Sequence, residues 1–391
     1  MKKLFLIKYG EIAIKGKNRY LFEDALLRNI RKSIQDIGSF KLVKEQGRII
    51  VEPRDDNYDE EEVKERLTRV FGIVGICPVI KVDSLDFEEI QKNVLLYMQE
   101  TYQDQKLTFK VEARRSNKSY PLNSPEIARE VGAYLLEHMP TLSVDVHHPQ
   151  VRVWIELRNS VYIYSKVIPG LGGMPVGTNG KAMLLLSGGI DSPVAGWMIA
   201  KRGVKLEGVY FHSHPYTSDR AKEKVIELGR KLAVYTGEFT LHVVPFTTIQ
   251  MEIYEKCPHV QLTIIMRRIM MRIAEEIAKK QKAFGLITGE SIGQVASQTI
   301  QSLSVTNAVC TLPVFRPLIG FDKQEIITIA EKIDTYETSI LPYEDCCTIF
   351  VAKHPQTKPK LENIEQSEKL LEQMDVMIKE AIEKTEVIRV S

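Results

Sequence analysis

One short segment constrains the fold of this chain more than any other: residues 183–192, which read MLLLSGGIDS. A run of apolar residues ends at Ser187, two glycines follow, and a helical pattern begins near Ser192. Adjacent glycines let backbone N–H groups approach an anion closely, and the start of a helix adds partial positive charge. The pattern therefore predicts a buried strand, then a phosphate-binding turn through Gly188 and Gly189, then a helix.

Asp191 stands out within this turn because a carboxylate repels a phosphate. We therefore expect Asp191 to hold Mg²⁺ or to cap the loop. The turn is not a Walker A loop, since no Gly-Lys-Ser/Thr is present, and it lacks the dinucleotide G-x-G-x-x-G pattern. The alternative is a glycine-rich strand-to-helix turn with no chemical role.

Around this loop, apolar strands alternate with helical patterns. Such alternation predicts an α/β fold with a doubly wound parallel sheet, in which ligands bind beyond the carboxyl ends of the strands. We expect a glycine-rich linker at 169–179 and the α/β domain over 180–391. The expected strands are 182–186, 205–211, 240–245 and 284–288, and the expected helices are 193–202, 218–236, 260–281, one from Ser291, 323–333 and 361–384.

The front of the chain follows a different order of elements. Its pattern reads strand, helix, two strands, helix, strand, which predicts an α+β ferredoxin-like domain, placed at 1–75, and a second α+β domain over 76–168. The expected strands are 3–9, 41–52 (a strand or a hairpin around Gly47), 79–82, 107–113, 151–157 and 161–166, and the expected helices are 18–37, 58–70, 87–101 and 124–138.

Charge is distributed unevenly along the 391 residues. The chain holds 53 Lys and Arg against 51 Asp and Glu, a net charge of only +2. Residues 1–50 nevertheless carry 12 basic and 5 acidic side chains, whereas residues 51–100 carry 6 and 13. A basic segment is typical of proteins that bind a phosphate backbone, although a solvated surface shows the same charge.

Cysteine usage and hydropathy indicate the compartment. The chain has five cysteines, an odd and sparse set, which fits free thiols in a reducing cytoplasm better than a disulfide framework. No run of about 18 apolar residues occurs, so no membrane-spanning helix is expected. The N-terminal apolar run is interrupted by Lys8 and Glu11 and is read as a strand, not as a signal peptide.

The SGGIDS motif resembles the PP-loop of the N-type ATP pyrophosphatases. That resemblance implies cleavage of ATP between its α- and β-phosphates and transfer of AMP to a substrate oxygen. The motif alone leaves open amide-forming synthetases, NAD synthetase, tRNA-lysidine synthetases and tRNA thiolases. Another PP-loop enzyme that modifies tRNA or forms an amide is therefore the alternative, and an RNA-binding module with an inactive ATP site is a third reading.

Five further segments are similar to the ThiI-type tRNA 4-thiouridine synthetases. Residues 8–19 (KYGEIAIKGKNR) resemble the opening of that family, and residues 109–115 (FKVEARR) and 121–129 (PLNSPEIAR) lie where it has its THUMP RNA-binding domain. Residues 177–183 (GTNGKAM) and 288–298 (TGESIGQVASQ) resemble the family on either side of the loop. The resemblance covers nearly the whole chain and implies the order ferredoxin-like, THUMP, PP-loop.

The family resemblance also implies a reaction. ATP, with Mg²⁺, activates O4 of uridine 8 in tRNA as an adenylate and releases pyrophosphate, and a persulfide sulfur then displaces AMP to give 4-thiouridine. Activation comes first because a carbonyl oxygen is a poor leaving group and AMP is a good one. The resemblance further implies that the enzyme supplies sulfur for the thiazole ring of thiamine.

The resemblance assigns an ATP site residue by residue. Arg267, on the expected long helix, would neutralise charge on the phosphates. Arg268 competes for that role, because adjacent side chains on a helix point about 100° apart. For any one position the alternative is an ordinary scaffold role. The implied ATP-binding residues are Met183, Leu184, Ser187, Gly188, Gly189, Asp191, Ser192, Tyr210, Phe211, Arg267, Gly289 and Gln298.

Cys346 is the expected catalytic thiol, together with Asp191 at the phosphate loop. The family places a cysteine at this position to act on the activated uridine, and the neighbouring Cys347 is the alternative carrier of the persulfide. Sulfur transfer requires a thiolate. The adjacent Glu344 and Asp345 would raise the pKa of that thiol unless a cation lies nearby.

The source of sulfur is a separate expectation. Long family members carry a rhodanese-like domain for the persulfide, and the sequence stops at Ser391 after one charged helical segment, so we expect a cysteine desulfurase as donor. One branch of the family uses an iron–sulfur cluster on three cysteines, but Cys257 has no C-x-x-C beside it. His212 and His214 could form a metal pair, although a polar loop is the favoured reading.

The tRNA surface is expected on basic residues of the first two domains, whose contacts to phosphates position the RNA without reading its sequence. The sequence leaves open whether two copies form a homodimer. The candidate tRNA-binding residues are Lys15, Lys17, Arg19, Arg114, Arg115 and Lys118.

Overall fold

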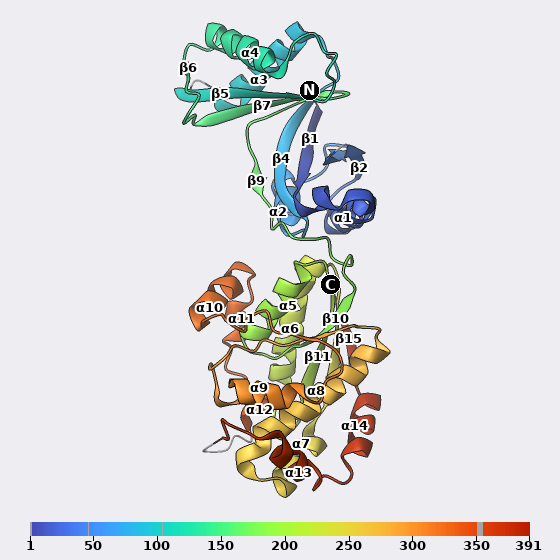
Figure 1. Cartoon of the computed structure of the whole chain (residues 1–391). Coiled ribbons are helices and arrows are strands. Elements are labelled where there is room, and N and C mark those ends of the chain that lie inside the picture. The colour runs from blue at the N-terminus through green and yellow to red at the C-terminus, as the bar shows by residue number, and fades with distance from the viewer. Residues whose placement is uncertain (1, 46, 104, 350–354) are drawn as a thin grey trace. The chain divides into compact units, whose positions relative to one another are not determined.

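The computed structural model describes residues 2–45, 47–103, 105–349 and 355–391. The chain divides into two compact units, Met1–Gly173 and Met174–Ser391, coloured blue to green and green to red in Figure 1. The division falls inside the glycine-rich stretch 169–179. Among the described residues, no helix has the length and apolar character needed to cross a membrane.

The N-terminal unit is built from strands, α-helices and two short 3₁₀ turns that precede its first helix. In chain order they are β1 (Lys2–Tyr9), η1 (Glu11–Ile14), η2 (Gly16–Asn18), α1 (Arg19–Ile34), β2 (Phe40–Glu45), β3 (Arg48–Pro53), α2 (Glu60–Thr68), β4 (Ile73–Val82), α3 (Phe87–Tyr102), β5 (Leu107–Arg115), α4 (Ser124–His138), β6 (Leu142–Val144), β7 (Val151–Leu157), β8 (Val161–Tyr164) and β9 (Ile168–Pro169).

These strands form one nine-stranded sheet in the order β2-β3-β1-β4-β8-β7-β5-β6, with β9 also paired to β4. β4 joins the two halves, because it pairs antiparallel with β1 along its length and with β8 at its end, where Ile80 lies opposite Ile163. β4 therefore runs through residue 75, where the sequence placed a domain boundary. The 79–82 strand is longer than expected, and β6 was not anticipated.

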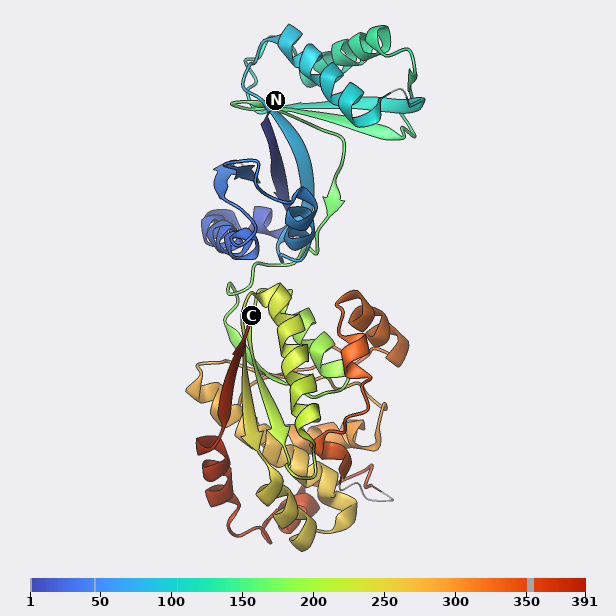
Figure 2. The ribbon, with the colours of Figure 1, turned by 180° about the vertical axis from the view of Figure 1, so that it is seen from behind.

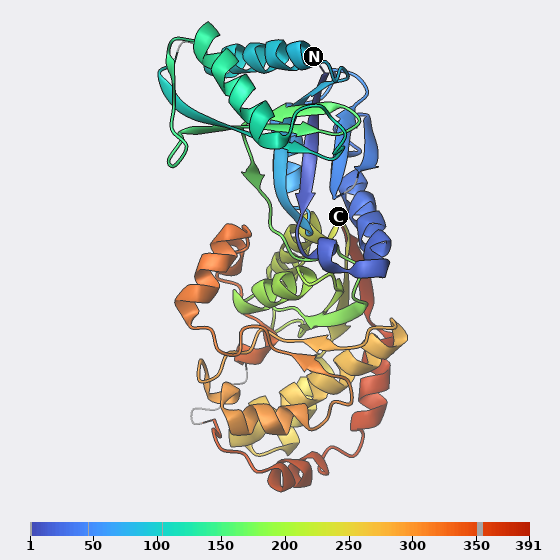
Figure 3. The same cartoon turned by 45° about the horizontal axis from the view of Figure 1, so that its top comes forward.

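Alternation along the strands separates the two faces of this sheet. Ile7 and Ile76 pack into the core beneath α1 and α2, while Ile80 and Ile163 pack beneath α3 and α4. Figure 3 shows α3 and α4 lying across the strands of their half. The opposite face carries a smaller cluster that includes Cys77.

The C-terminal unit contains the remaining elements. In chain order they are β10 (Lys181–Leu185), α5 (Asp191–Ala200), β11 (Lys205–His212), α6 (Asp219–Thr236), β12 (Phe239–Pro245), α7 (Thr247–Lys256), η3 (His259–Gln261), α8 (Leu262–Lys280), β13 (Leu286–Ile287), η4 (Ala296–Gln298), α9 (Ile300–Asn307), β14 (Val314–Phe315), α10 (Lys323–Lys332), α11 (Tyr336–Ser339), α12 (Cys346–Ile349), α13 (Leu361–Glu368), α14 (Met374–Glu383) and β15 (Glu386–Val390).

Its six-stranded sheet has the order β14-β13-β10-β11-β12-β15 and is parallel except for β15. Figure 2 shows β15, in dark red, along the outer side of β12. The helix α5 lies very close to the central strand, since a Cβ at Gly196 would come within 2.6 Å of Leu184. The parallel sheet with crossover helices confirms the α/β fold class predicted for this half.

Two expected helices were wrong in detail. The helix expected from Ser291 begins instead at Ile300, where the side chain of Thr299 caps it, and the intervening segment turns through Gly293 at φ +79°. The single charged helix expected over 361–384 consists of two helices, α13 and α14, followed by the edge strand β15.

Candidate functional site

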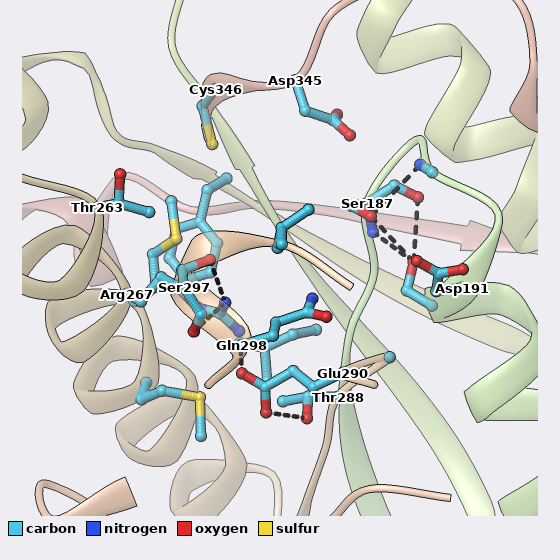
Figure 4. A pocket seen from close by; sticks show the side chains of 18 of the residues that line it. Ser187, Asp191, Thr263, Arg267, Thr288, Glu290, Ser297, Gln298, Asp345 and Cys346 are labelled. Carbon is cyan, nitrogen blue, oxygen red and sulfur yellow. Dashed lines mark hydrogen bonds and ion pairs between the residues drawn. The ribbon is translucent and has the colours of Figure 1, made fainter. Parts of the chain in front are cut away.

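A cavity of about 520 Å³ lies at the carboxyl ends of β10, β11 and β13 in the C-terminal unit. This is the edge at which ligands bind in parallel α/β sheets. The helix α8 forms one wall, since side chains spaced three and four residues apart share one helix face. Figure 4 shows the cavity with its polar side chains. The residues that α8 contributes are Thr263, Ile264, Arg267, Met270 and Met271.

The predicted phosphate loop lines this cavity between β10 and α5. The hydroxyl of Ser192 ties the loop together, because it accepts the Ser187 N–H at 2.9 Å and lies 3.1 Å from the Ser187 hydroxyl. Gly189 N–H reaches the Ser187 Oγ at 3.4 Å. A Cβ at Gly289 would meet the Ser192 nitrogen at 2.7 Å, so only glycine allows the neighbouring loop to pack here.

Asp191 is the first residue of α5 and lines the cavity. Its carboxylate accepts from Lys323 Nζ at 2.6 Å and from Gln294 Nε2 at 2.9 Å. The Asp191 carboxylate is the kind of oxygen ligand that Mg²⁺ takes together with substrate phosphates and water, which is the usual mode for this ion. Lys323 was not singled out from the sequence, where it appeared only as the first residue of an expected helix.

A buried carboxylate organises the opposite side of the cavity. Glu290 is 3% exposed and pairs with Arg267, with Arg316 Nε at 2.6 Å, and with the Thr288 hydroxyl at 2.8 Å. Burial alone would raise the pKa of Glu290, but the two guanidinium groups outweigh it and hold that pKa below its usual 4.5. Neither Glu290 nor Arg316 was singled out from the sequence.

The two adjacent arginines of α8 lie in different surroundings. Arg267 lines the cavity and donates to the Ser297 hydroxyl at 3.0 Å. Arg268 is 3% exposed, points away from the cavity, and pairs with Glu368 at 2.7 Å. Arg267 is therefore the one whose guanidinium can meet a bound phosphate.

Cys346 lies at the cavity, 4% exposed, at the start of α12. Figure 4 shows its sulfur pointing inward and the Asp345 carboxylate turned toward the phosphate loop. The Gly188 N–H donates to Asp345 Oδ2 at 2.9 Å. Burial raises the pKa of Asp345, opposed by that hydrogen bond and by Lys224. The side chain of the alternative thiol, Cys347, lies outside the part that the structure describes.

The structure brings most of the expected ATP-site residues to one cavity. Met183 and Leu184 are exceptions, because both lie on β10 with fully buried side chains and do not line the cavity. Gly188 contributes to the loop but is not among the lining residues either. The expected residues that line the cavity are Ser187, Gly189, Asp191, Ser192, Tyr210, Phe211, Arg267, Gly289 and Gln298.

The metal alternatives find no ligand set in the described residues, where no three His, Cys, Asp or Glu side chains are grouped to hold an ion. Burial raises the pKa of Cys257 to about 11, so this thiol is protonated at neutral pH. The rings of His212 and His214 lie 6.2 Å apart, and burial lowers the pKa of His212.

The basic candidates of the N-terminal unit fall into two groups. Arg19 pairs with Glu23 at 2.7 Å, and Arg115 donates to the backbone carbonyls of Lys118 and Tyr120, so both guanidinium groups hold local structure. The Lys15 ammonium lies over the Phe22 ring. The exposed members are Lys17, Lys118 and Arg114, whose guanidinium also stacks over Trp154.

Comparison with known families defines the class of protein. A ThiI ferredoxin-like domain matches residues 4–77, a THUMP domain matches residues 85–166, and the model of the thiamine biosynthesis protein ThiI matches residues 177–373. The chain thus combines an RNA-binding type of domain with an ATP-pyrophosphatase type of domain.

Whole-chain relatives agree with these matches. The chain is 61% identical to a probable tRNA sulfurtransferase of Lachnoclostridium phytofermentans and 59% identical to one of Acetivibrio thermocellus, covering all of each. A crystal structure of a 4-thiouridine synthetase–RNA complex with bound ATP matches with a TM-score of 0.92 and 41% identity over all of both chains. The chain belongs to the ThiI family.

Proposed function

We propose that this protein is an ATP-dependent tRNA sulfurtransferase that converts uridine 8 of tRNA to 4-thiouridine. One observation carries the proposal: a phosphate loop, a guanidinium group and a thiol line the same cavity, through Ser187, Arg267 and Cys346. Membership of the ThiI family and the ATP-bound, RNA-bound relative support the same reaction.

The chemistry follows from the positions of these groups. O4 of the uridine attacks the α-phosphorus of ATP and pyrophosphate leaves, while the loop amides and Arg267 stabilise the charge on the phosphates. The terminal sulfur of a persulfide then attacks C4, and AMP departs with the former O4. A second thiol attacks the inner sulfur of the resulting C4–S–S linkage, which forms a disulfide with the carrier cysteine and leaves 4-thiouridine. Mg²⁺, where bound beside Asp191, would neutralise further phosphate charge.

The proposal also includes a sulfur donor and a cellular compartment. Cys346 offers a thiol that can accept sulfur from a cysteine desulfurase acting as partner, and the reducing cytoplasm keeps such a thiol free. Among the described cysteines all four are free thiols. The family also supports a supply of sulfur for the thiamine thiazole. A homodimer is compatible with this function. Light scattering of the purified protein measures the molar mass and so distinguishes a monomer from a dimer.

The direct test uses purified protein, ATP, Mg²⁺, a cysteine desulfurase with cysteine, and an unmodified tRNA transcript. We expect 4-thiouridine in the nucleoside digest, and none when uridine 8 is replaced by cytidine. Formation of 2-thiouridine, or pyrophosphate release that tRNA does not stimulate, would point to the alternative classes of PP-loop enzyme.

A further inference from the structure

Two segments far apart in the sequence meet at the phosphate loop. The Asp345 carboxylate accepts the Gly188 N–H at 2.9 Å, although 157 positions separate the two residues. The aliphatic part of Lys224 lies on the same spot, since a Cβ at Gly188 would be 3.3 Å from both its Cδ and its Cε. Gly188 is thus enclosed by an anionic side chain and a cationic one.

A loop amide beside a buried ammonium group is an anion-binding arrangement. Lys224 is 6% exposed and donates to the Leu341 carbonyl at 2.8 Å, so its charge is held in place next to the loop. The carboxylate of Asp345 thereby occupies the kind of position that a phosphate oxygen prefers. A carboxylate and a phosphate cannot both accept the same N–H in good geometry.

The residue after Asp345 is the candidate thiol. Its backbone carbonyl accepts from Gln250 Nε2 at 2.7 Å, and Gln250 in turn is fixed by the Ser213 hydroxyl at 2.6 Å. The position of Cys346 is therefore set from two sides, by Gln250 on α7 and by the contact of Asp345 with the loop. When the bond between Asp345 and Gly188 is lost, the bond from Gln250 to the Cys346 carbonyl remains.

We propose that Asp345 is a positioning residue that links the nucleotide to the thiol: it holds Cys346 by its bond to Gly188, and the phosphates of ATP displace it from that amide. ATP binding then changes the position of Cys346 before sulfur transfer. This inference rests on the proposed function, because it requires that ATP occupies the phosphate loop.

The test compares Asp345→Ala and Asp345→Asn with the wild-type protein. Glu344→Gln is the matched control, because Glu344 is the adjacent acid and is exposed. This substitution removes the same charge as the two Asp345 variants. The probe is α,β-methylene-ATP with Mg²⁺, which binds without releasing pyrophosphate. Calorimetry measures its dissociation constant, and peptide mass spectrometry measures the rate at which iodoacetamide alkylates Cys346 with and without the probe.

We expect Asp345→Ala to bind the probe about tenfold more tightly than the wild-type protein, because a competing charge-assisted hydrogen bond is removed. The probe should change the alkylation rate of Cys346 in the wild type and in Glu344→Gln, and this change should largely vanish in Asp345→Ala. Asp345→Asn should lie between them, since an amide oxygen still accepts the Gly188 N–H but carries no charge.

Two other results would contradict a proposal made above. If both Asp345 variants bind the probe no more tightly than the wild type and retain its effect on alkylation, the displacement by phosphate is wrong while the ATP site stands. If the wild-type protein does not bind the probe at all, the proposed function itself is contradicted.

Discussion

In the C-terminal unit one carboxylate at the site is buried between two arginines, whereas the basic candidates of the N-terminal unit that are not engaged locally lie in solvent. Glu290, 3% exposed, is held between Arg267 and Arg316. Lys17 and Lys118, by contrast, are exposed on short turns and loops. The two units thus place charge in very different dielectric surroundings.

This difference determines what each unit can do with its charge. Buried charges act strongly at short range and are little screened by salt, so they suit the stabilisation of a transition state. Exposed charges more than about 10 Å apart are screened at 0.1 M salt and act additively on a polyanion. We therefore expect large effects of single substitutions in the cavity and small, salt-dependent effects in the N-terminal unit.

The largest effect is expected at the phosphate loop. Asp191→Asn should lower the rate of 4-thiouridine formation by about 10³-fold, because it removes the charge that Lys323 and a bound Mg²⁺ require. Asp219→Asn is the matched control, since Asp219 is likewise the first residue of its helix and does not line the cavity. Equal loss in the two variants would contradict a role for Asp191 at the site.

The neighbouring arginines should separate activity from stability. Arg267→Ala should lower turnover by about 10²-fold, and it should lower the free energy of unfolding by less than Arg268→Ala does, because Glu290 keeps its second partner Arg316. Arg268→Ala should lower the free energy of unfolding by about 3 kcal/mol, because it breaks a buried pair with Glu368, and leave turnover per folded molecule nearly unchanged. Urea denaturation and turnover assays measure both, and the reverse pattern would place the wrong arginine in the cavity.

Glu290→Gln tests the buried network through the pH dependence of the free energy of unfolding. We expect a loss of about 2 kcal/mol in the free energy of unfolding at pH 7. Because the arginines hold the pKa of Glu290 below 4.5, its stabilisation is fully present above pH 4.5 and is lost as the pH falls through the lower folded pKa. The variant should lack this part of the acid dependence. Identical acid profiles for the two proteins would rule out the network.

The smallest single effects are expected in the N-terminal unit. Lys17→Ala or Lys118→Ala should weaken tRNA binding only about threefold each at physiological salt, with a shallower dependence on salt concentration. Arg115→Ala should act differently, by loosening the loop that its guanidinium holds through Lys118 and Tyr120. Filter binding at several salt concentrations measures how tRNA affinity depends on salt. An affinity that does not change with salt concentration would contradict a surface that contacts phosphates.

The sequence allowed the phosphate loop to be predicted because its chemistry is local. Ser187, Gly188 and Ser192 form the turn within six positions. The network of Glu290 with Arg316, and the contact of Asp345 with Gly188, depend on how distant segments meet, which no local pattern reports. These contacts needed the folded chain.

The errors in secondary structure have similar causes. The helix expected from Ser291 fails because Ile292 and Val295 are about half exposed and so provide no apolar face to bury, and because Gly293 adopts a left-handed backbone. β15 is a charged five-residue edge strand whose existence depends on its pairing with β12. The segment contains three β-branched residues, which favour a strand, but it was not singled out from the sequence.

The central claim is that one cavity activates the uridine and delivers the sulfur, with Cys346 needed only for the second step. The most direct measurement follows pyrophosphate and 4-thiouridine together in Cys346→Ser, with tRNA, ATP and a desulfurase. We expect tRNA-dependent pyrophosphate release to remain, while 4-thiouridine falls by at least about 10³-fold. Thiolation at the wild-type rate in this variant would contradict the account.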